Sequence, residues 1–239
     1  MRGRPSLTVA TAAVAGLLLL AGCGSSTSGT PSTSASTSAP AASSVFTVRP
    51  VECQAPAYGP PAGRAAATGA LPACAPTSQL STANLEVGPN PNAVNGYTAN
   101  SIPPDPQFAD YPSTTVAGDL PAATVLLGNA NTSQGTGRFV LGPTAITGGS
   151  VTSAAAQLAN GQWVVNVLFN AAGSAAYDAL GRAQFHAYVA ADLDATVLSA
   201  ALVQPTTYTF TSFAGQMVIT GASGQQQAQS WATEISHSH

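Results

Sequence analysis

The chain has 239 residues, of which only 6% are charged, and its six arginines and no lysine stand against nine acidic residues. A typical globular domain has about 25% charged residues. So few basic residues exclude a basic surface for nucleic acid, and a 45% hydrophobic content excludes a highly charged disordered protein. The length allows one domain of ordinary size with tails, or two small domains.

Residues 1–22 are typical of an export signal. Arg2 and Arg4 form a short positive region, residues 7–20 are mostly apolar, and small residues precede Cys23. The apolar run is shorter than the roughly 20 residues that span a membrane. The Leu-Ala-Gly-Cys sequence at 20–23 resembles the bacterial lipobox, which implies cleavage before Cys23 and attachment of diacylglycerol and palmitate-type acyl chains there. The alternative is an ordinary secretory signal in which this cysteine occurs by chance.

The lipobox resemblance implies a lipoprotein anchored on the extracytoplasmic face of the cell membrane. Two or three acyl chains hold a protein stably at a membrane, whereas a single chain holds it only marginally. Residues 23–44 are almost wholly Ser, Thr, Ala, Gly and Pro and carry no charge. Such a segment cannot bury enough apolar surface to fold, so we expect a flexible tether. The composition leaves O-glycosylation of this tether open.

The other two cysteines, Cys53 and Cys74, are predicted to form a disulfide. An exported chain meets an oxidising compartment, and the number of remaining cysteines is even. Closing a loop of this length stabilises a fold by roughly 3 kcal/mol. Metal binding and redox catalysis are disfavoured, because the pair lacks C-x-x-C spacing and has no histidine nearby. The sequence predicts no metal site and no cofactor.

Residues 45–137 are predicted to be a loop-rich region that contains this disulfide. Pro and Gly are dense between Pro56 and Pro121, which argues against long helices and central strands there. Strands are expected only at 46–49 and 124–127.

Residues 138–236 are predicted to form the folded core, with a frayed tail at 237–239. After a strand at 138–141, two apolar runs flank Asn160-Gly161, and this dipeptide is typical of a tight β-hairpin. Alternate residues of the second run are expected to share one face of the strand. They are Trp163, Val165, Val167 and Phe169.

A helix is predicted after this hairpin, with Ser174 as its N-cap. Strands follow at 185–191 and 196–203, joined by a turn from Asp192 to Ala195, and a last strand covers 216–220.

The final helix is predicted from a capping box formed by Ser223 and Gln226. Its apolar residues recur at helical spacing: Ala228, Trp231, Ala232 and Ile235. Because short connections favour antiparallel pairing, we expect an α+β fold in which two helices pack on one face of a mixed or antiparallel sheet.

Four stretches of the predicted core resemble the extracytoplasmic head domain of SecD, a subunit of the bacterial preprotein translocase. They are residues 138–148, 163–173, 189–200 and 217–235, and residues 46–51 resemble the strand that leads into this domain. Two alanines depart from the family pattern, which usually has glycine after Leu-Asp and proline after Ser-Ala. They are Ala195 and Ala201.

The resemblance implies a head domain that contacts exported polypeptides or translocase components. SecD proteins also carry transmembrane helices, but no apolar run after Leu20 approaches the required length. We therefore expect a SecD-like head domain without its transmembrane motor, placed on a lipid anchor.

No catalytic constellation is recognised in the sequence, and we expect no enzymatic activity. His186 has no accompanying G-x-S-x-G elbow and is interpreted as a strand residue. Asp192 and Asp194 are interpreted as turn residues, since Asp is favoured in turns and a calcium loop needs more oxygen ligands.

The candidate contact residues are three aromatics in a loop-like stretch between strands: Tyr208, Phe210 and Phe213. Exposed aromatic side chains often mark a protein interface, and the alternative is that these rings plug one edge of the core. The leading hypothesis is a non-enzymatic envelope protein with a protein-contact role, accessory to protein export. The alternative is a carrier or sensor for a lipid or another apolar ligand.

Overall fold

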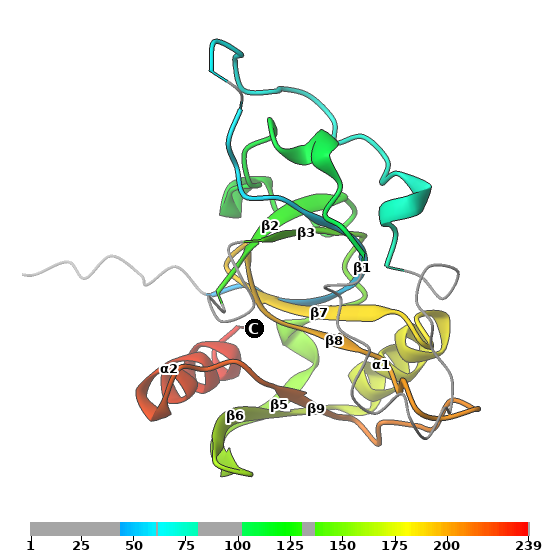
Figure 1. Cartoon of the computed structure of the whole chain (residues 1–239). Helices are drawn as coiled ribbons and strands as arrows, with labels where there is room; N and C mark the ends of the chain where they lie inside the picture. Colours follow the sequence, from blue (N-terminus) through cyan, green and yellow to red (C-terminus); the bar gives the residue numbers. More distant parts are fainter. Residues whose placement is uncertain (1–43, 61, 81–101, 131–136, 239) are drawn as a thin grey trace, which may run out of the picture. The chain divides into compact units, whose positions relative to one another are not determined.

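The computed structural model describes residues 44–60, 62–80, 102–130 and 137–238. The export signal, Cys23 and almost all of the tether lie outside these residues. The described residues belong to one unit that begins at Ala42, and they form two sheets and two helices (Figure 1). The α+β class expected from the sequence is confirmed.

Five strands close into a small barrel. They are β1 (Phe46–Ala55), β2 (Val125–Asn129), β3 (Arg138–Leu141), β7 (Tyr188–Leu193) and β8 (Thr196–Leu202). Their order is β3-β2-β8-β7-β1, and β1 also pairs with β3, which completes the ring. Pairing is antiparallel except between β2 and β8, so the sheet is mixed as expected, but the sequence pattern does not predict its closure. A short strand, β4 (Ile146–Thr147), pairs with β1 outside the ring.

Apolar side chains fill the interior of the barrel, because alternate residues of each strand point to the same face. They include Val51, Val125, Leu127, Phe139, Leu141, Tyr188, Ala190 and Val197. Arg49 lies two residues before Val51 on β1, and Asp192 lies two residues after Ala190 on β7. Both are fully buried. The interior therefore contains ionisable groups as well as aliphatic ones.

The smaller sheet has three antiparallel strands in the order β5-β6-β9. They are β5 (Val151–Ala159), β6 (Gln162–Phe169) and β9 (Gln216–Ile219). The predicted hairpin between β5 and β6 is confirmed. Its turn residues Asn160 and Gly161 have φ of 50° and 78°, which Asn and Gly adopt most readily. The predicted shared face of β6 is also confirmed, since Trp163, Val165, Val167 and Phe169 all pack in one apolar cluster.

Both helices pack on the face of the smaller sheet that is turned toward the barrel (Figure 1). They are α1 (Ala171–Ala183) and α2 (Gln225–Ser236). The predicted stripe of α2 is buried, and it shares its cluster with Phe46 and Leu198 of the barrel and Val167 of the sheet. One apolar core thus joins the barrel, the sheet and the helices.

The predicted N-caps of both helices are wrong. Helix α1 begins one turn earlier than expected, because the Asn170 side chain accepts a hydrogen bond from the Gly173 N–H, while Ser174 donates back to the Asn170 carbonyl. Helix α2 follows Gly224 and has no side-chain cap. The Gln227 side chain instead accepts a hydrogen bond from the Ser223 N–H.

The turn between β7 and β8 is shorter than predicted. It consists of Asp194 and Ala195, with φ of 48° and 59°, and Asp192 belongs to β7. Residues 185–187 are a turn rather than strand. The reassignment of Asp192 matters because a side chain interpreted as part of a turn is buried in the barrel.

Among the described residues, the loop segments before residue 125 contain short turns of 3-10 helix at Pro76–Ser78, Pro106–Phe108 and Val116–Gly118, and Gln79 forms an isolated bridge with Cys53 of β1. The predicted disulfide between Cys53 and Cys74 is present, with 6.1 Å between the Cα atoms. It ties a loop to β1, beside a cluster that includes Phe108 and Leu126. Since β1 and β2 are barrel strands, residues on both sides of position 138 build one core.

Two buried arginines fasten these loops to the barrel. Arg49 donates hydrogen bonds to the carbonyls of Leu120, Ala123 and Gly142. Arg138 donates to the carbonyls of Pro56, Phe108 and Tyr111. The main-chain acceptors of irregular segments are thereby satisfied without regular pairing.

The end of the described chain is packed and not frayed. Ser238 is buried, and its hydroxyl donates to the Ile235 carbonyl. A side chain at Gly148 would collide with the Ser238 carbonyl, at 1.8 Å from an added Cβ. None of the described helices combines the length and the apolarity needed to cross a membrane.

Candidate protein-contact site

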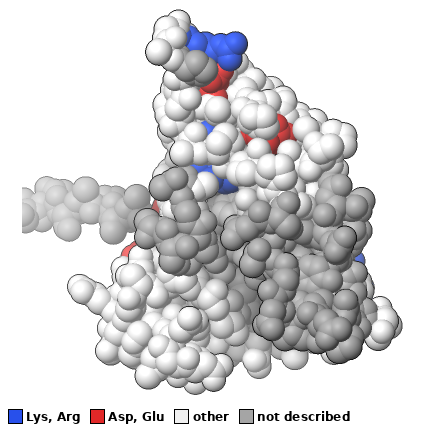
Figure 2. Space-filling view, viewed as in Figure 1, with Lys and Arg blue, Asp and Glu red and all other residues white. Residues whose placement is uncertain are grey.

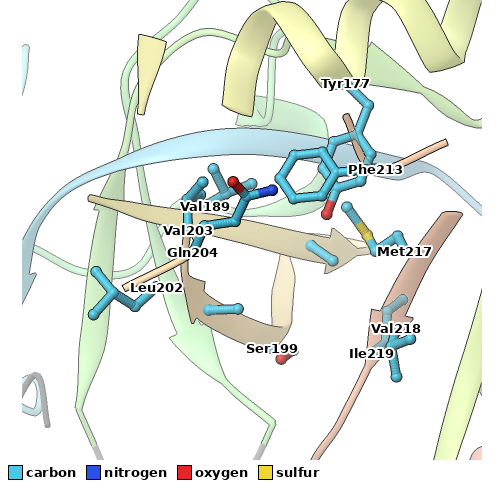
Figure 3. A pocket seen from close by; sticks show the side chains of 12 residues that line it. Tyr177, Val189, Ser199, Leu202, Val203, Gln204, Phe213, Met217, Val218 and Ile219 are labelled. Atoms are coloured by element: carbon cyan, nitrogen blue, oxygen red, sulfur yellow. The ribbon is translucent and has the colours of Figure 1, made fainter. Parts of the chain in front are cut away.

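A groove lies between the barrel strand β8 and the sheet strand β9 (Figure 3). Its cavity volume is about 110 Å³, and its lining is mainly apolar. The residues that line it are Tyr177, Val189, Ala191, Ser199, Ala201, Leu202, Val203, Gln204, Phe213, Met217, Val218 and Ile219. We call this feature the β8–β9 groove.

An aromatic stack closes one end of the β8–β9 groove. The rings of Tyr177 and Phe213 are stacked with 4.3 Å between centroids, and Phe169 meets Tyr177 edge-on at 5.5 Å. Gly181 of α1 makes room for the stack, because a Cβ there would lie 2.3 Å from the Phe213 ring. The stack therefore depends on a helix position with no side chain.

Few polar groups face the groove. Burial and, to a smaller extent, the neighbouring charge of Asp178 raise the pKa of Tyr177 to about 12, so this hydroxyl stays protonated at physiological pH. Ser199 lies 3.4 Å from the Thr220 hydroxyl, which links β8 to the end of β9. A mostly apolar lining with a few placed hydroxyls is typical of binding sites.

The strands that form the walls leave main-chain groups available. Among the described strands, β9 pairs only with β6 and is thus an edge strand. Strand β8 pairs with β7 throughout, but with β2 only at Thr196 and Val197. A row of main-chain donors and acceptors on an edge strand can pair with an added extended segment.

The three predicted contact residues take different positions. Phe210 and Phe213 pack against the apolar core, and their rings meet edge-on at 5.3 Å. Tyr208 has 79% of its surface exposed. Only Phe213 of the three lines the β8–β9 groove.

Polar contacts hold the loop that contains Phe210 and Phe213 against α1. The Asp178 carboxylate accepts a hydrogen bond from the Phe213 N–H, and the pKa of Asp178 is lowered, first by the Ser212 hydroxyl. The Arg182 guanidinium lies over the Phe210 ring at 5.1 Å. Gln204 uses its side-chain amide to bind both the N–H and the carbonyl of Thr211. The loop is therefore positioned by named contacts on both sides.

His186 lies beside this loop, with its Nε2 atom 2.8 Å from the Thr207 carbonyl. Its ring stacks on Phe185 with 3.9 Å between centroids, and its φ is 61°. The ring nitrogen thus contacts a main-chain carbonyl in the turn before β7. These contacts give His186 a role in holding the loop.

A second polar cluster lies inside the barrel. The Arg49 guanidinium is 2.6 Å from an Asp119 carboxylate oxygen and 3.8 Å from an Asp192 oxygen. The Thr47 hydroxyl donates to Asp192 at 2.7 Å. The other Asp192 oxygen has no hydrogen-bond partner among the described residues. One guanidinium thus faces two carboxylates in a buried site.

The protonation of this cluster follows from its burial. Loss of hydration raises the pKa of Asp192 to about 7, helped by the charge of Asp119 and opposed by Thr47 and Arg49. Burial also raises the pKa of Asp119, although Arg49 lowers it. The cluster is not a metal-binding set, since no group of three or more His, Cys, Asp or Glu side chains in the described residues could hold an ion.

Sequence reasoning missed most of the groove. Tyr177, Gln204 and Met217 come from three separate elements, and only their packing brings them together. The sequence contains one weak indication that Tyr177 is buried. It directly follows the apolar helix residue Ala176, so it widens the apolar stripe of α1 that packs against the core. Cys23, the other predicted site residue, lies outside the described residues.

Comparison with known proteins bears on residues 125–237, which match the family model described as SecDF, P1 head subdomain. No curated protein matches the chain. Two solved structures are similar in part. One is described as SecDF, a membrane component that enhances protein export; the identity is 16%, the TM-score is 0.41, and the match covers 82% of this chain and 63% of that one.

The other is SecDF in a super-membrane-facing form, with 16% identity and a TM-score of 0.41. That match covers 81% of this chain and 19% of the other. The chain thus spans less than two thirds of either structure. Residues 125–237 of this chain are thus similar to the P1 head subdomain of SecDF.

Proposed function

We propose that the chain is a non-enzymatic protein-contact module of the cell envelope, held at the extracytoplasmic face by a lipid on Cys23 and accessory to protein export. The observation that carries the contact role is the β8–β9 groove in a SecD-head-like domain. Its proposed ligand is an extended, largely apolar polypeptide segment, such as an exported chain or a translocase component.

The form of the groove favours such a ligand. One wall is the edge strand β9, which offers main-chain hydrogen bonds, and the lining offers apolar contacts for side chains. Recognition by strand addition uses these two ingredients, because main-chain bonds provide affinity and small pockets select alternate side chains. Charge plays little part, since no charged residue lines the groove.

The alternative, a carrier of a lipid or other apolar ligand, is less well supported. Small-molecule sites usually enclose about 300–1,000 Å³, whereas the groove cavity is about 110 Å³. The barrel interior is filled by its own side chains. Native mass spectrometry of protein extracted under mild conditions tests this alternative, and a retained lipid would favour it.

The contact role is tested by filling the groove. Ala201→Trp places an indole ring at an exposed lining position of β8, and Leu168→Trp places the same ring at an exposed position of β6 outside the groove. Fluorescence anisotropy with a labelled, reduced and alkylated unfolded polypeptide should show about tenfold weaker binding for the first variant, which is about 1.4 kcal/mol. Equal binding by both variants, or no binding by the parent protein, would contradict the proposal.

The anchor is tested separately. Cys23→Ser should move the protein from the membrane fraction to the soluble fraction and abolish incorporation of labelled palmitate, because the thiol that accepts the lipid is gone. Unchanged membrane fractionation of this variant would overturn the lipoprotein assignment and leave the contact role untouched.

A further inference from the structure

Strand β5 forms the other edge of the smaller sheet. In the order β5-β6-β9 it pairs only with β6 among the described strands. Its nine residues, VTSAAAQLA, contain no charge and no proline. Natural edge strands are usually protected from pairing by charged side chains, proline or a cover. The β5 edge lacks the first two of these protections.

The pairing pattern shows which main-chain groups point outward. Ala159 and Gln162 flank the two-residue turn, so hydrogen-bonded pairs with β6 alternate with non-bonded pairs from that point. Ala154, Ala156 and Leu158 therefore direct their N–H and carbonyl groups away from β6. The Ser236 hydroxyl lies 3.2 Å from the Ala154 nitrogen and 3.4 Å from its carbonyl oxygen, as this pattern requires.

Ser236 covers the edge at Ala154 only. Within the described residues, no hydrogen bond is made by the outward N–H and carbonyl groups of Ala156 and Leu158. The available edge is therefore two outward-facing residues long. It is centred on Gln157, whose side chain accepts a hydrogen bond from Asn166 on the opposite face of the sheet from α2.

A shallow groove of about 540 Å³ runs beside this edge, between β5 and α2. It is lined by Ala154, Ala155, Ala156, Gln229, Ala232, Thr233, Ser236 and His237. Leu158 is 56% exposed and lies on the same face of β5 as Ala156, since it pairs with Trp163. A protruding leucine thus stands beside a groove of small side chains.

The β5 edge and Leu158 of one copy are complementary to the β5 edge and the groove of a second copy. If two β5 strands pair antiparallel with Gln157 opposite Gln157, Ala156 of each copy faces Leu158 of the other. The four outward N–H and four outward carbonyl groups of these residues then lie in reach of one another, and each leucine packs at the groove of the other copy. A two-fold contact of this kind is the commonest form of self-association.

Charge permits this pairing. No Asp, Glu, Lys or Arg lies on β5 or lines the groove beside α2, so no charged side chain of these two features opposes the contact. Figure 2 shows the coloured charged atoms mainly over the upper part of the described chain, while the lower part that contains α2 is almost uncoloured. We infer that two copies of the chain form a dimer through β5, about a two-fold axis at Gln157. This inference is independent of the function proposed above.

Disulfide trapping tests the register. Gln157→Cys places the new thiols on the two-fold axis, where opposite residues of an antiparallel pair have Cβ atoms about 4.5–5.5 Å apart. Ser153→Cys places a thiol on the same face of the same strand, four residues from the axis. In a Cys23→Ser background of the full chain, mild oxidation should give a covalent dimer with the first variant and at least tenfold less with the second.

Sedimentation velocity tests the dimer without a crosslink. A contact of two residue pairs belongs among interfaces smaller than about 1,200 Å², which associate weakly, so the measurement needs concentrations up to the millimolar range. Leu158→Lys should keep the protein monomeric, whereas Leu168→Lys, which adds the same charge to the outer face of the sheet, should dimerise like the parent. A parent chain that stays monomeric, or equal crosslinking by both cysteine variants, would overturn the proposal. Trapping of an unfolded polypeptide by Gln157→Cys in preference to a second copy would overturn it as well.

Discussion

The barrel and the three-stranded sheet differ in their free strand edges and in where their charged side chains lie. The barrel has no free edge over most of its strands, because β1 closes the ring, and it keeps Arg49 and Asp192 in its interior. The sheet has two edge strands and an uncharged β5. In a chain with only 6% charged residues, the barrel interior contains buried charges, whereas neither edge strand of the sheet, β5 or β9, carries a charged side chain. We therefore expect substitutions in the barrel to change stability most, and substitutions along the sheet edges to change the proposed binding.

Removal of the Arg49 guanidinium is expected to have the largest effect on the stability of the barrel. Arg49→Ala leaves Asp119 and Asp192 without their counter-ion and frees three loop carbonyls. Loss of one partner of a buried ion pair costs about 3–5 kcal/mol, and urea denaturation should show a loss of this size. Arg64→Ala is the matched control, since the Arg64–Asp110 pair is largely exposed on its arginine side and should cost less than about 1 kcal/mol.

Titration of Asp192 gives the next largest effect. Its folded pKa of about 7 lies above the ordinary value of 3.8, so folding takes up a proton between these values. Its contribution to stability is full below about pH 4, is lost as the pH rises to about 7, and is constant above that. The free energy of unfolding should therefore fall by a few kcal/mol over this window. Asp192→Asn should remove most of that slope, and an unchanged slope would show that other carboxyls cause it.

The disulfide tests whether the loops stabilise the barrel. Its sequence separation is 21, and closing a loop of this size contributes roughly 3 kcal/mol. Cys53→Ser with Cys74→Ser should lower the unfolding free energy by up to this amount, because Cys53 is buried on β1. Calorimetry of the double variant checks the value. Binding of polypeptide at the β8–β9 groove should survive wherever the variant remains folded.

Gly181→Ala tests the packing of α1 against the aromatic rings beside the smaller sheet. Alanine favours helix over glycine by about 1 kcal/mol, but the new Cβ would lie 2.3 Å from Phe213 and 2.7 Å from Phe210. Overpacking of this kind costs about 1–3 kcal/mol, so we expect net destabilisation and weaker polypeptide binding. Gly149→Ala is the control, because its Cβ would meet no atom closer than 3.9 Å. A stabilised Gly181→Ala variant would show that the aromatic stack moves freely.

The smallest effect is expected on the outer face of the sheet. Leu168 is 42% exposed on β6, and substitutions at such positions usually change stability by less than about 0.5 kcal/mol. Leu168→Lys should therefore leave the thermal midpoint almost unchanged. A large loss would mean that this face is covered by another part of the chain, and would weaken the contrast between the two regions.

Short sequence patterns predicted the elements that are determined by residues close together in the chain. The Asn160-Gly161 turn has the backbone freedom that the hairpin needs, and the stripe of α2 follows helical periodicity. The cap of α1 was misplaced because both Asn170 and Ser174 have suitable side chains, and the structure uses the earlier one. Ala195 adopts φ of 59°, an unusual conformation for alanine, so no residue type in this turn indicated that Asp192 lies outside it.

Features that depend on distant pairing were not predictable in this way. Closure of the barrel needs β1 to pair with β3 and β7, and no property of residues 46–55 specifies those partners. The β8–β9 groove likewise joins residues from α1, β7, β8, β9 and the loop before β9. The resemblance to a SecD head, in contrast, anticipated the family match of residues 125–237.

The position of β1 has a consequence for how the chain reaches its folded state. Phe46 pairs with Leu193, so the first strand must wait for a partner almost 150 residues later. Proteins dominated by such distant contacts fold slowly, because the entropy of closing a long loop is lost before the contacts form. A chain that emerges from a membrane with its N-terminus first would therefore remain open until β7 and β8 had passed, and its barrel would close only after most of the chain had been delivered.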